Sequence, residues 1–477
     1  MRAPPAPAPE PDASAAADLL YVWRVTRFSS IAEFLSGTGG TPQSIGDSIA
    51  DAVGRAHADN PAWHIYTRIL DSQALRAVES MRSGARAPLL GVPVALKDNI
   101  DIAGELTSCG RRLGVGPAVA SAAIVARLGA LGAIIIGKTN LDTAALGATG
   151  RNPHFGRCHN PRFADRLSGG SSSGSAAAVA AGHALLGIGT DTLGSARIPA
   201  AFCGIAGFKP TPGRLPTAGV APLCPRFDSV GLLAGSLTDI TLVTEALFGQ
   251  GAQDRSPGGT PGPGLRLAVL DDTALGDVAN DVADGYRRCV GLLRVADDFH
   301  GSHAPRMDWS ATARAGLWKV AHDFALRSAG GMPGYHALAD IDGELGRLLA
   351  RAAALPATHL AAGEALIAES SSQLRQSLIE ADAVLTPTCP QGAPRMDEEL
   401  AKNVAAFVAP ANLAGLPAVA WTQRLGAELS LSLQLIGRPG GDVQVLALAT
   451  RVQRLLDRAF ATPSRSAKPP LAGPPLP

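Results

Sequence analysis

Short apolar runs accompanied by stretches of helical periodicity are the feature that most constrains the fold of this chain. Each run has the length of a buried strand and is bounded by glycine or polar residues. The clearest runs lie at residues 91–97, 133–137, 267–271, 383–386 and 429–437. Helical patterns accompany them, as at residues 122–131 and 443–456. This alternation predicts an α/β fold whose sheet is covered on both faces by helices.

The chain is long and apolar enough to bury a large core, with 477 residues of which 46% are hydrophobic. Its two ends are rich in alanine and proline, and residues 1–18 and 462–477 are predicted to be disordered because they cannot bury enough surface. The ordered part lies between them, at residues 19–461; its length alone suggests two or three domains, although a large α/β sheet often forms one. Residues 250–264 are the richest internal stretch of proline and glycine, which predicts a surface connector.

Composition and charge exclude several classes of function. The net charge is +1, so the sequence carries no basic footprint for nucleic acid. The six cysteines form no CxxC pair, which favours the reduced thiols of a cytoplasmic protein over disulfides or a metal site. The N-terminus lacks the apolar core of a signal peptide, and no uncharged apolar run is long enough to span a membrane. We therefore expect a soluble cytoplasmic protein that needs no metal or other cofactor.

Two short motif matches are interpreted as coincidences. Residues 132–139 fit the phosphate-loop pattern GxxxxGK[ST], with Lys138 as the phosphate ligand. The interior of that match is Ala-Ile-Ile-Ile, which belongs in a buried strand and not in a phosphate-binding loop. Residues 170–174 fit the nucleophile-elbow pattern GxSxG around Ser172, but the preceding residues 162–168 are too charged for the buried strand that an elbow requires.

Three distant segments carry the most specific pattern in the chain. They are residues 91–101 (GVPVALKDNID), 168–175 (SGGSSSGS) and 189–200 (GTDTLGSARIPA). At these residues the sequence resembles the amidase signature family, because the segments follow the order and the spacing of that family. Further matches lie at residues 137–140 (GKTN), 207–214 (GFKPTPGR), 386–388 (TPT) and 434–439 (QLIGRP).

This resemblance covers residues 21–456 and is weakest between residues 250 and 381. It implies a large mixed β-sheet covered on both faces by α-helices. It also implies that residues 19–461 form a single amidase domain, in which residues 250–381 are a variable middle region.

The resemblance also implies the chemistry. An amide carbonyl resists attack, so an amidase needs a nucleophile, a proton carrier and donors for the tetrahedral oxyanion. The family pattern makes Ser195 the nucleophile, Ser171 a bridge in a cis peptide, and Lys97 the base behind Ser171. The oxyanion hole falls to the backbone N–H groups of Thr192, Leu193, Gly194 and Ser195, with Gly170, Asp191 and Arg197 in support.

Lys97 must be neutral to act as a base, although a solvated lysine titrates near 10.4. It ends the apolar run from residue 89 to residue 96, so burial is expected to lower its pKa. Pro199 is predicted to begin a helix just after Ser195, which would leave the preceding N–H groups free.

Two residues depart from the family pattern. Leu193 stands where the family has glycine or alanine, and leucine tolerates positive φ badly. Either the turn uses ordinary φ at Leu193 or the oxyanion hole is altered, and the bulky side chain could narrow the acyl pocket. Thr143 stands where the family often has an acidic residue. Neither change removes a catalytic group.

The sequence therefore predicts an amidohydrolase that cleaves the C–N bond of a linear carboxamide through an acyl-serine intermediate. Its expected partner is a small-molecule amide, without nucleic acid or membrane; the oligomeric state stays open, with a homodimer as one option. One alternative is the catalytic A-type component of an aminoacyl-tRNA amidotransferase. Another is an allophanate-type ureido-acid hydrolase, in which Arg151 or His154 would anchor a carboxylate. A non-catalytic binding protein on the same scaffold is disfavoured, because all three catalytic side chains are present.

Overall fold

A computed structural model describes residues 28–82, 84–111, 116–249, 264–296, 298–329, 343–425 and 430–461. The ends predicted to be disordered, residues 1–18 and 462–477, lie outside the described residues. So does the predicted connector at residues 250–264, apart from its last residue. No helix in the described part of the chain is long and apolar enough to cross a bilayer.

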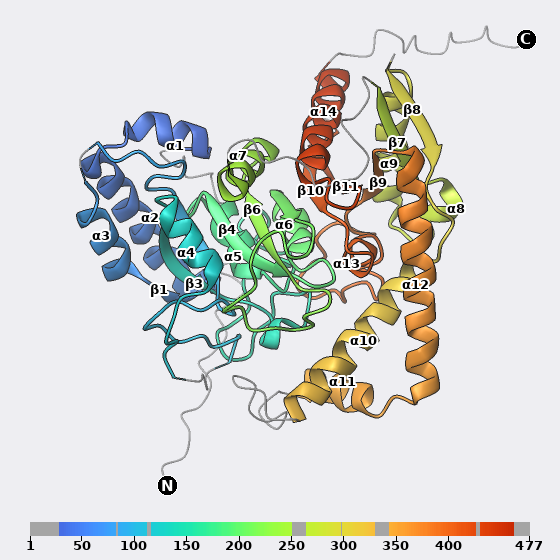
Figure 1. The fold of residues 1–477 in the computed structure, drawn as a ribbon, viewed down its shortest axis with the longest axis horizontal. Helices are drawn as coiled ribbons and strands as arrows, with labels where there is room; N and C mark the ends of the chain where they lie inside the picture. Colours follow the sequence, from blue (N-terminus) through green and yellow to red (C-terminus); the bar gives the residue numbers. More distant parts are fainter. Residues whose placement is uncertain are drawn as a thin grey trace, which may run out of the picture.

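The strands form one sheet of eleven members in the order β1-β3-β2-β4-β6-β5-β10-β11-β9-β7-β8 (Figure 1). All five predicted strands are found in it. The strands are β1 (Tyr66–Ile69), β2 (Pro93–Lys97), β3 (Ile134–Thr139), β4 (Leu186–Asp191), β5 (Ala206–Lys209), β6 (Ser229–Ala234), β7 (Leu265–Val269), β8 (Phe299–His303), β9 (Ala383–Pro387), β10 (Ala418–Arg424) and β11 (Ser430–Gly437).

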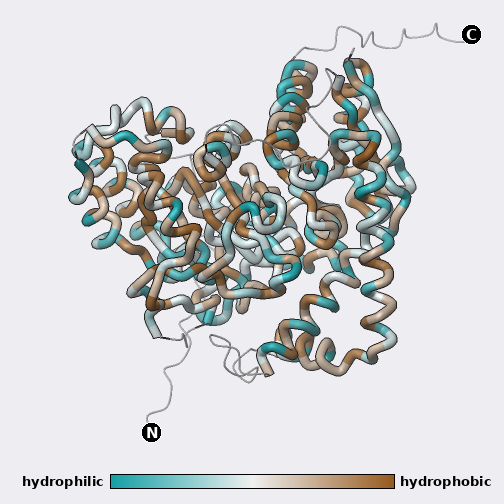
Figure 2. Tube along the Cα trace, viewed as in Figure 1, coloured by the Kyte–Doolittle hydropathy of each residue, from teal (hydrophilic) through white to brown (hydrophobic). Residues whose placement is uncertain are grey.

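Helices flank this sheet, and the two predicted helical stretches correspond to α4 and α14. The helices are α1 (Ile31–Thr38), α2 (Pro42–Trp63), α3 (Asp71–Glu79), α4 (Ala123–Ala130), the 3-10 turn η1 (Thr143–Ala145), α5 (Ser173–Ala180), α6 (Arg197–Cys203), α7 (Leu237–Phe248), α8 (Asp272–Leu275), α9 (Asn280–Arg294), α10 (Trp309–Ala329), α11 (Gly343–Ala353), α12 (Ala357–Glu380), α13 (Ala409–Leu413) and α14 (Asp442–Ala461). The α14 helix carries both hydrophobic and hydrophilic residues along its length, as a helix with one buried face requires (Figure 2).

The sheet is mixed, as expected. Strand β2 runs parallel to β3 and β4, and β7 runs parallel to β8 and β9. The remaining pairs are antiparallel. Because β2 and β4 are parallel neighbours, their carboxyl ends meet at one edge of the sheet, which brings Lys97 and Asp191 to the same place.

Both faces of the sheet are covered, which confirms the predicted architecture. Val94 and Leu96 of β2 join a core cluster with residues of α4, α7 and α14, whereas Ala95 between them joins a cluster with α2 and α5. In β6, Leu232 joins the first of these clusters, whereas Leu233 joins a further cluster with residues of α5 and α6. Successive residues of a strand point to opposite faces, so each face has its own layer of helices.

The middle region of the chain adds a helical group. Helix α10 packs against α11, α12 and α13, and Figure 1 shows α10 and α11 at the lower right with α12 running downward to the right of them. Apolar side chains of α10, α11 and α12 form one cluster with Phe227 and with the partly buried Leu193. The least family-like part of the sequence therefore lies against the segment that the sequence singled out as catalytic.

Candidate active site

Lys97 lies at the buried carboxyl end of β2. Its Nζ donates hydrogen bonds to Ser171 Oγ and to Thr190 Oγ1, each at 2.8 Å. Thr190 is close because Leu96 pairs with Ile188 in the parallel ladder of β2 and β4. Two of the three predicted segments thus meet at the lysine amine, and the third contributes Thr190, a partner that sequence reasoning did not single out.

Burial lowers the pKa of Lys97 from its ordinary value to about 7. The carboxylates of Asp142, Asp191 and Asp228 act in the opposite direction, because negative charge favours the ammonium form. Desolvation is the larger effect, so the neutral amine becomes accessible near neutral pH. An amine in this state can accept a proton.

Ser171 is fully buried in the loop that precedes α5, and the Gly170–Ser171 peptide is cis. Gly170 lies against Asp142, because a Cβ at residue 170 would overlap Asp142 Oδ2. The Asp142 carboxylate accepts hydrogen bonds from the N–H groups of Thr149 and Gly150, each at 3.1 Å. Asp142 therefore fixes the loop under Ser171. Its position two residues after the GKTN segment was the available sequence signal, but sequence reasoning singled out the neighbouring threonine instead.

We expect Gly170→Ala to reduce both stability and activity, because the new methyl group would displace the Asp142 carboxylate and the loop that carries Ser171. Overpacking of this kind costs roughly 1–3 kcal/mol. Thermal unfolding and amide turnover measure the two effects. Gly116→Ala is the matched control, since no atom lies within 4 Å of a Cβ at that position. Equal melting temperatures and turnover for both variants would contradict the role given to this contact.

Ser195 lies between β4 and α6 and is 9% exposed. Its backbone carbonyl accepts a hydrogen bond from the N–H of Ser172 at 3.0 Å, which ties the two serine segments together. The hydroxyl of Ser172 itself donates to the carbonyl of Thr190 at 3.1 Å. Ser172 is thus engaged with the backbone, in agreement with the rejection of the nucleophile-elbow match. Helix α6 begins at Arg197, so the prediction that Pro199 begins it is wrong by two residues.

Asp191 and Arg197 form a buried ion pair that fixes the turn around Ser195. Arg197 Nη2 and Nε lie 2.8 and 2.9 Å from the two carboxylate oxygens of Asp191. Burial alone would raise the pKa of Asp191, but the Arg197 guanidinium holds it well below its usual range. The remaining Arg197 donors reach Val408 O, Gln434 Oε1 and Asn412 Oδ1. Every charge in this pair is compensated, which a buried ion pair requires.

The backbone donors of this turn differ in one respect from the expectation. The N–H of Gly194 donates to Asp191 Oδ1 at 2.8 Å, so it is already engaged within the turn. The N–H groups of Thr192, Leu193 and Ser195 make no hydrogen bond to other described residues. The predicted set of four oxyanion donors is thereby reduced to three. The conformation also answers the question raised by Leu193, which keeps ordinary φ while Gly194 adopts φ of 110°.

Asp228 supports the same turn from the opposite side and was missed by sequence reasoning. Thr192 Oγ1 donates to Asp228 Oδ1 at 2.7 Å, and the N–H groups of Leu223 and Cys224 donate to the same carboxylate. Burial raises the pKa of Asp228 above its ordinary value. No local motif marks this aspartate, because its partners lie up to 36 residues away.

The structure also places the other residues that the sequence singled out. Lys138 lies on β3, where its Nζ contacts Asp98 Oδ1 at 3.0 Å and donates to the carbonyl of Ile100, so the phosphate-loop match is a strand end. Arg151 is exposed, and its Nη2 donates to the carbonyl of Met396 at 3.4 Å. His154 is partly buried, and its backbone N–H donates to Asn152 Oδ1. The described residues contain no group of three or more His, Cys, Asp or Glu side chains placed to hold a metal ion.

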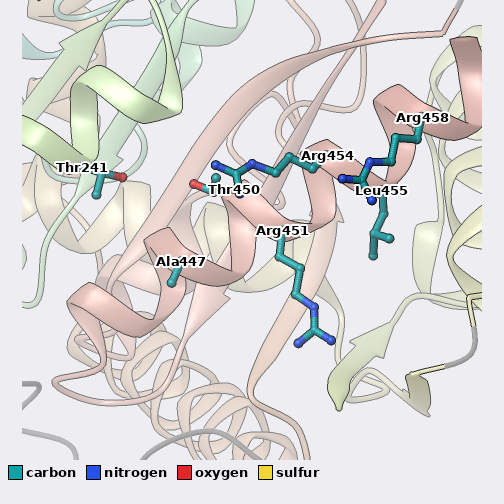
Figure 3. A pocket seen from close by; sticks show the side chains of 7 residues that line it. All are labelled: Thr241, Ala447, Thr450, Arg451, Arg454, Leu455 and Arg458. Atoms are coloured by element: carbon teal, nitrogen blue, oxygen red, sulfur yellow. The ribbon is translucent and has the colours of Figure 1, made fainter. Parts of the chain in front are cut away.

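A groove between α7 and α14 lies apart from these residues. It has a volume of about 540 Å³ and is lined by Thr241 of α7 and by α14 residues that include Arg451, Arg454 and Arg458 (Figure 3). Arg451 forms an ion pair with Asp298. None of the lining residues belongs to the site around Lys97, so this surface plays no part in the proposed chemistry.

Known proteins share both the fold and the sequence pattern of this chain. The Amidase family model matches residues 47–295 and 343–446. This chain belongs to the amidase signature family.

Named relatives include both amidotransferase components and hydrolases. The A-type component of the glutamyl-tRNA(Gln) amidotransferase of Symbiobacterium thermophilum is 33% identical over 442 residues, covering 84% of this chain and 90% of the relative. Indoleacetamide hydrolase of Pseudomonas syringae pv. syringae is 38% identical over 289 residues, covering 57% of this chain and 63% of the relative. The crystal structure of an amidase superposes with a TM-score of 0.73 and 27% identity, covering 90% of this chain and all of that one.

Proposed function

We propose that the protein is an amidase that hydrolyses the C–N bond of a small carboxamide through an acyl-Ser195 intermediate. The observation that carries the proposal is the buried Lys97 amine, whose pKa is lowered to about 7 and whose Nζ lies 2.8 Å from Ser171 Oγ. The loop that holds Ser171 is tied to Ser195 through the N–H of Ser172. This arrangement supports the assignment of a base, a bridge and a nucleophile to adjoining segments.

The reaction begins with proton transfer. Neutral Lys97 accepts the proton of Ser171 as Ser171 accepts that of Ser195. Ser195 Oγ bonds to the carbonyl carbon, and the C=O electron pair moves onto oxygen, where the N–H groups of Thr192, Leu193 and Ser195 stabilise it. Collapse breaks the C–N bond, and the proton returns through Ser171 to the leaving amine. Water then attacks the ester in the same way and releases the acid.

An uncharged, apolar acyl group is the substrate class that the surroundings support. Leu146 and Leu193 pack against the apolar cluster formed by α10, α11 and α12. Arg151, the candidate anchor for the carboxylate of a ureido acid, is exposed and donates to Met396 O instead. The name of the indoleacetamide hydrolase relative points to an arylacetamide. Residues 19–461 are proposed as a single amidase domain, with residues 250–381 as its variable, substrate-facing part.

A second candidate is the A-type component of an aminoacyl-tRNA amidotransferase, because relatives with that name match most of this chain. Such a component works together with partner proteins and passes ammonia onto an activated acyl group. The six cysteines are free and buried, which fits a reducing compartment under either candidate. We accordingly place the protein in the cytoplasm.

The test is a screen of the purified protein for ammonia or amine release from arylacetamides, aliphatic amides, ureido acids and glutamine. We expect release from the apolar amides without any added protein, and none from Ser195→Ala prepared in parallel. Release from ureido acids alone would favour the allophanate-type alternative. If simple amides gave no product and turnover of glutamine required the other amidotransferase components, the second candidate would replace the first.

A further inference from the structure

Gly316 is a glycine in the interior of the long helix α10. Glycine weakens a helix relative to alanine, so a glycine in a helix interior is explained best by close packing at that position. A Cβ at this position would lie 3.0 Å from Leu413 Cδ1 and 3.3 Å from Leu193 Cδ2. Both distances are shorter than ordinary van der Waals contact between carbon atoms. The missing methyl group therefore leaves room for two leucine side chains.

Leu193 belongs to the turn that contains Ser195, and Leu413 lies beside that turn. Leu193 is two residues before the nucleophile and supplies one of the three free N–H groups. Leu413 ends α13, next to Asn412, whose Nδ2 donates to the carboxylate of Asp191 at 2.9 Å. Leu413 is 8% exposed and enclosed by its cluster, whereas Leu193 is only partly buried. A methyl group added at residue 316 would consequently displace Leu193 more readily than Leu413.

We propose that Gly316 is a specificity-determining residue, because it lets the Leu193 side chain rest against α10 and so sets the size of the acyl group that fits beside Ser195. The bulky Leu193 side chain in the turn is accommodated by the absence of a side chain at residue 316 on the facing helix. This inference rests on the proposed amidase function. Helix α10 thus adjusts the space around the turn through Leu193.

The experiment measures kcat/KM for a series of amides with acyl groups of increasing size. In Gly316→Ala, Leu193 must move away from α10 into the space beside Ser195, so large acyl groups should lose about tenfold in kcat/KM relative to small ones. Gly291→Ala in α9 is the matched control, because it also replaces a glycine inside a helix but no atom lies within 4 Å of its Cβ. This control should keep the preference of the wild type.

A double-mutant cycle separates displacement of Leu193 from a general disturbance of α10. Leu193→Ala should widen the preference towards large acyl groups, and in that background Gly316→Ala should cause no further change in preference. An equal loss on all amides, or the same shift with and without the Leu193 side chain, would overturn the inference. If the wild type turned over no amide at all, the proposed function would fail, and this proposal with it; turnover without a shift would defeat only the role of Gly316.

Discussion

Ser195→Ala should abolish amide hydrolysis and covalent labelling by a fluorophosphonate probe. Removing the Oγ atom removes the only atom that forms the acyl bond in the proposed reaction, so water must attack the amide directly. Loss of a serine nucleophile lowers turnover by about 10,000-fold or more. The variant should stay folded, because Ser195 contributes its backbone carbonyl, and not its hydroxyl, to the contact with Ser172. Turnover, labelling and thermal unfolding measure the three parts of this result.

Peptide mapping of the labelled wild type locates the nucleophile. The label should be on Ser195, because the Ser172 hydroxyl is already engaged with the carbonyl of Thr190. Ser80→Ala, which removes an exposed hydroxyl at the end of α3, should keep both turnover and labelling. A label on Ser172 would revive the nucleophile-elbow interpretation and contradict the proposed mechanism.

The strands that bury both faces were predictable from the sequence, because a short uncharged apolar run has few alternatives to a central strand. β2 and β3 are of this kind, and every residue of β2 is buried. β8 (FHGSH) carries no such signal, since it is an edge strand with mostly exposed side chains and is ordered by its pairing with β7. The order of the strands depends on pairings between residues far apart in sequence, which no local pattern encodes.

In the candidate site, the proposed catalytic residues were predictable from the sequence, whereas the residues that support them were not. Lys97, Ser171 and Ser195 were named through a family resemblance, and the structure joins Lys97 to Ser171 directly. The supporting carboxylates Asp142 and Asp228 were not named, because their roles depend on where a buried side chain points and on partners in other loops.

The donors of the oxyanion turn show the same limit of sequence reasoning. The family resemblance and the expected helix start predicted four free N–H groups, whereas the carboxylate of Asp191 accepts a hydrogen bond from the N–H of Gly194. The direction of a single N–H within a tight turn follows from φ at Gly194, which the sequence allows but does not dictate.

Activity should rise with pH through about 7 and reach a plateau above it, because only the neutral amine of Lys97 can accept the proton of Ser171. Burial has lowered the lysine pKa to about 7, so below that pH each further unit should reduce kcat/KM about tenfold. Lys97→Ala should lower turnover by roughly 100- to 10,000-fold and remove this acid limb. Lys97→Arg should not restore it, since a guanidinium stays protonated. The measurement is a pH profile of kcat/KM on one amide for each variant.

Lys209 supplies the decisive control for that profile. It is also fully buried, and burial together with the nearby Arg197 charge lowers its pKa to about 7 as well. Its Nζ, however, donates to the carbonyl of Pro210 and not to a serine. Lys209→Met should therefore keep the acid limb, with any change confined to stability or to the height of the plateau. If the limb vanished in Lys209→Met and persisted in Lys97→Ala, the proton path through Ser171 would be wrong, because the titrating group would then be the lysine that touches neither serine.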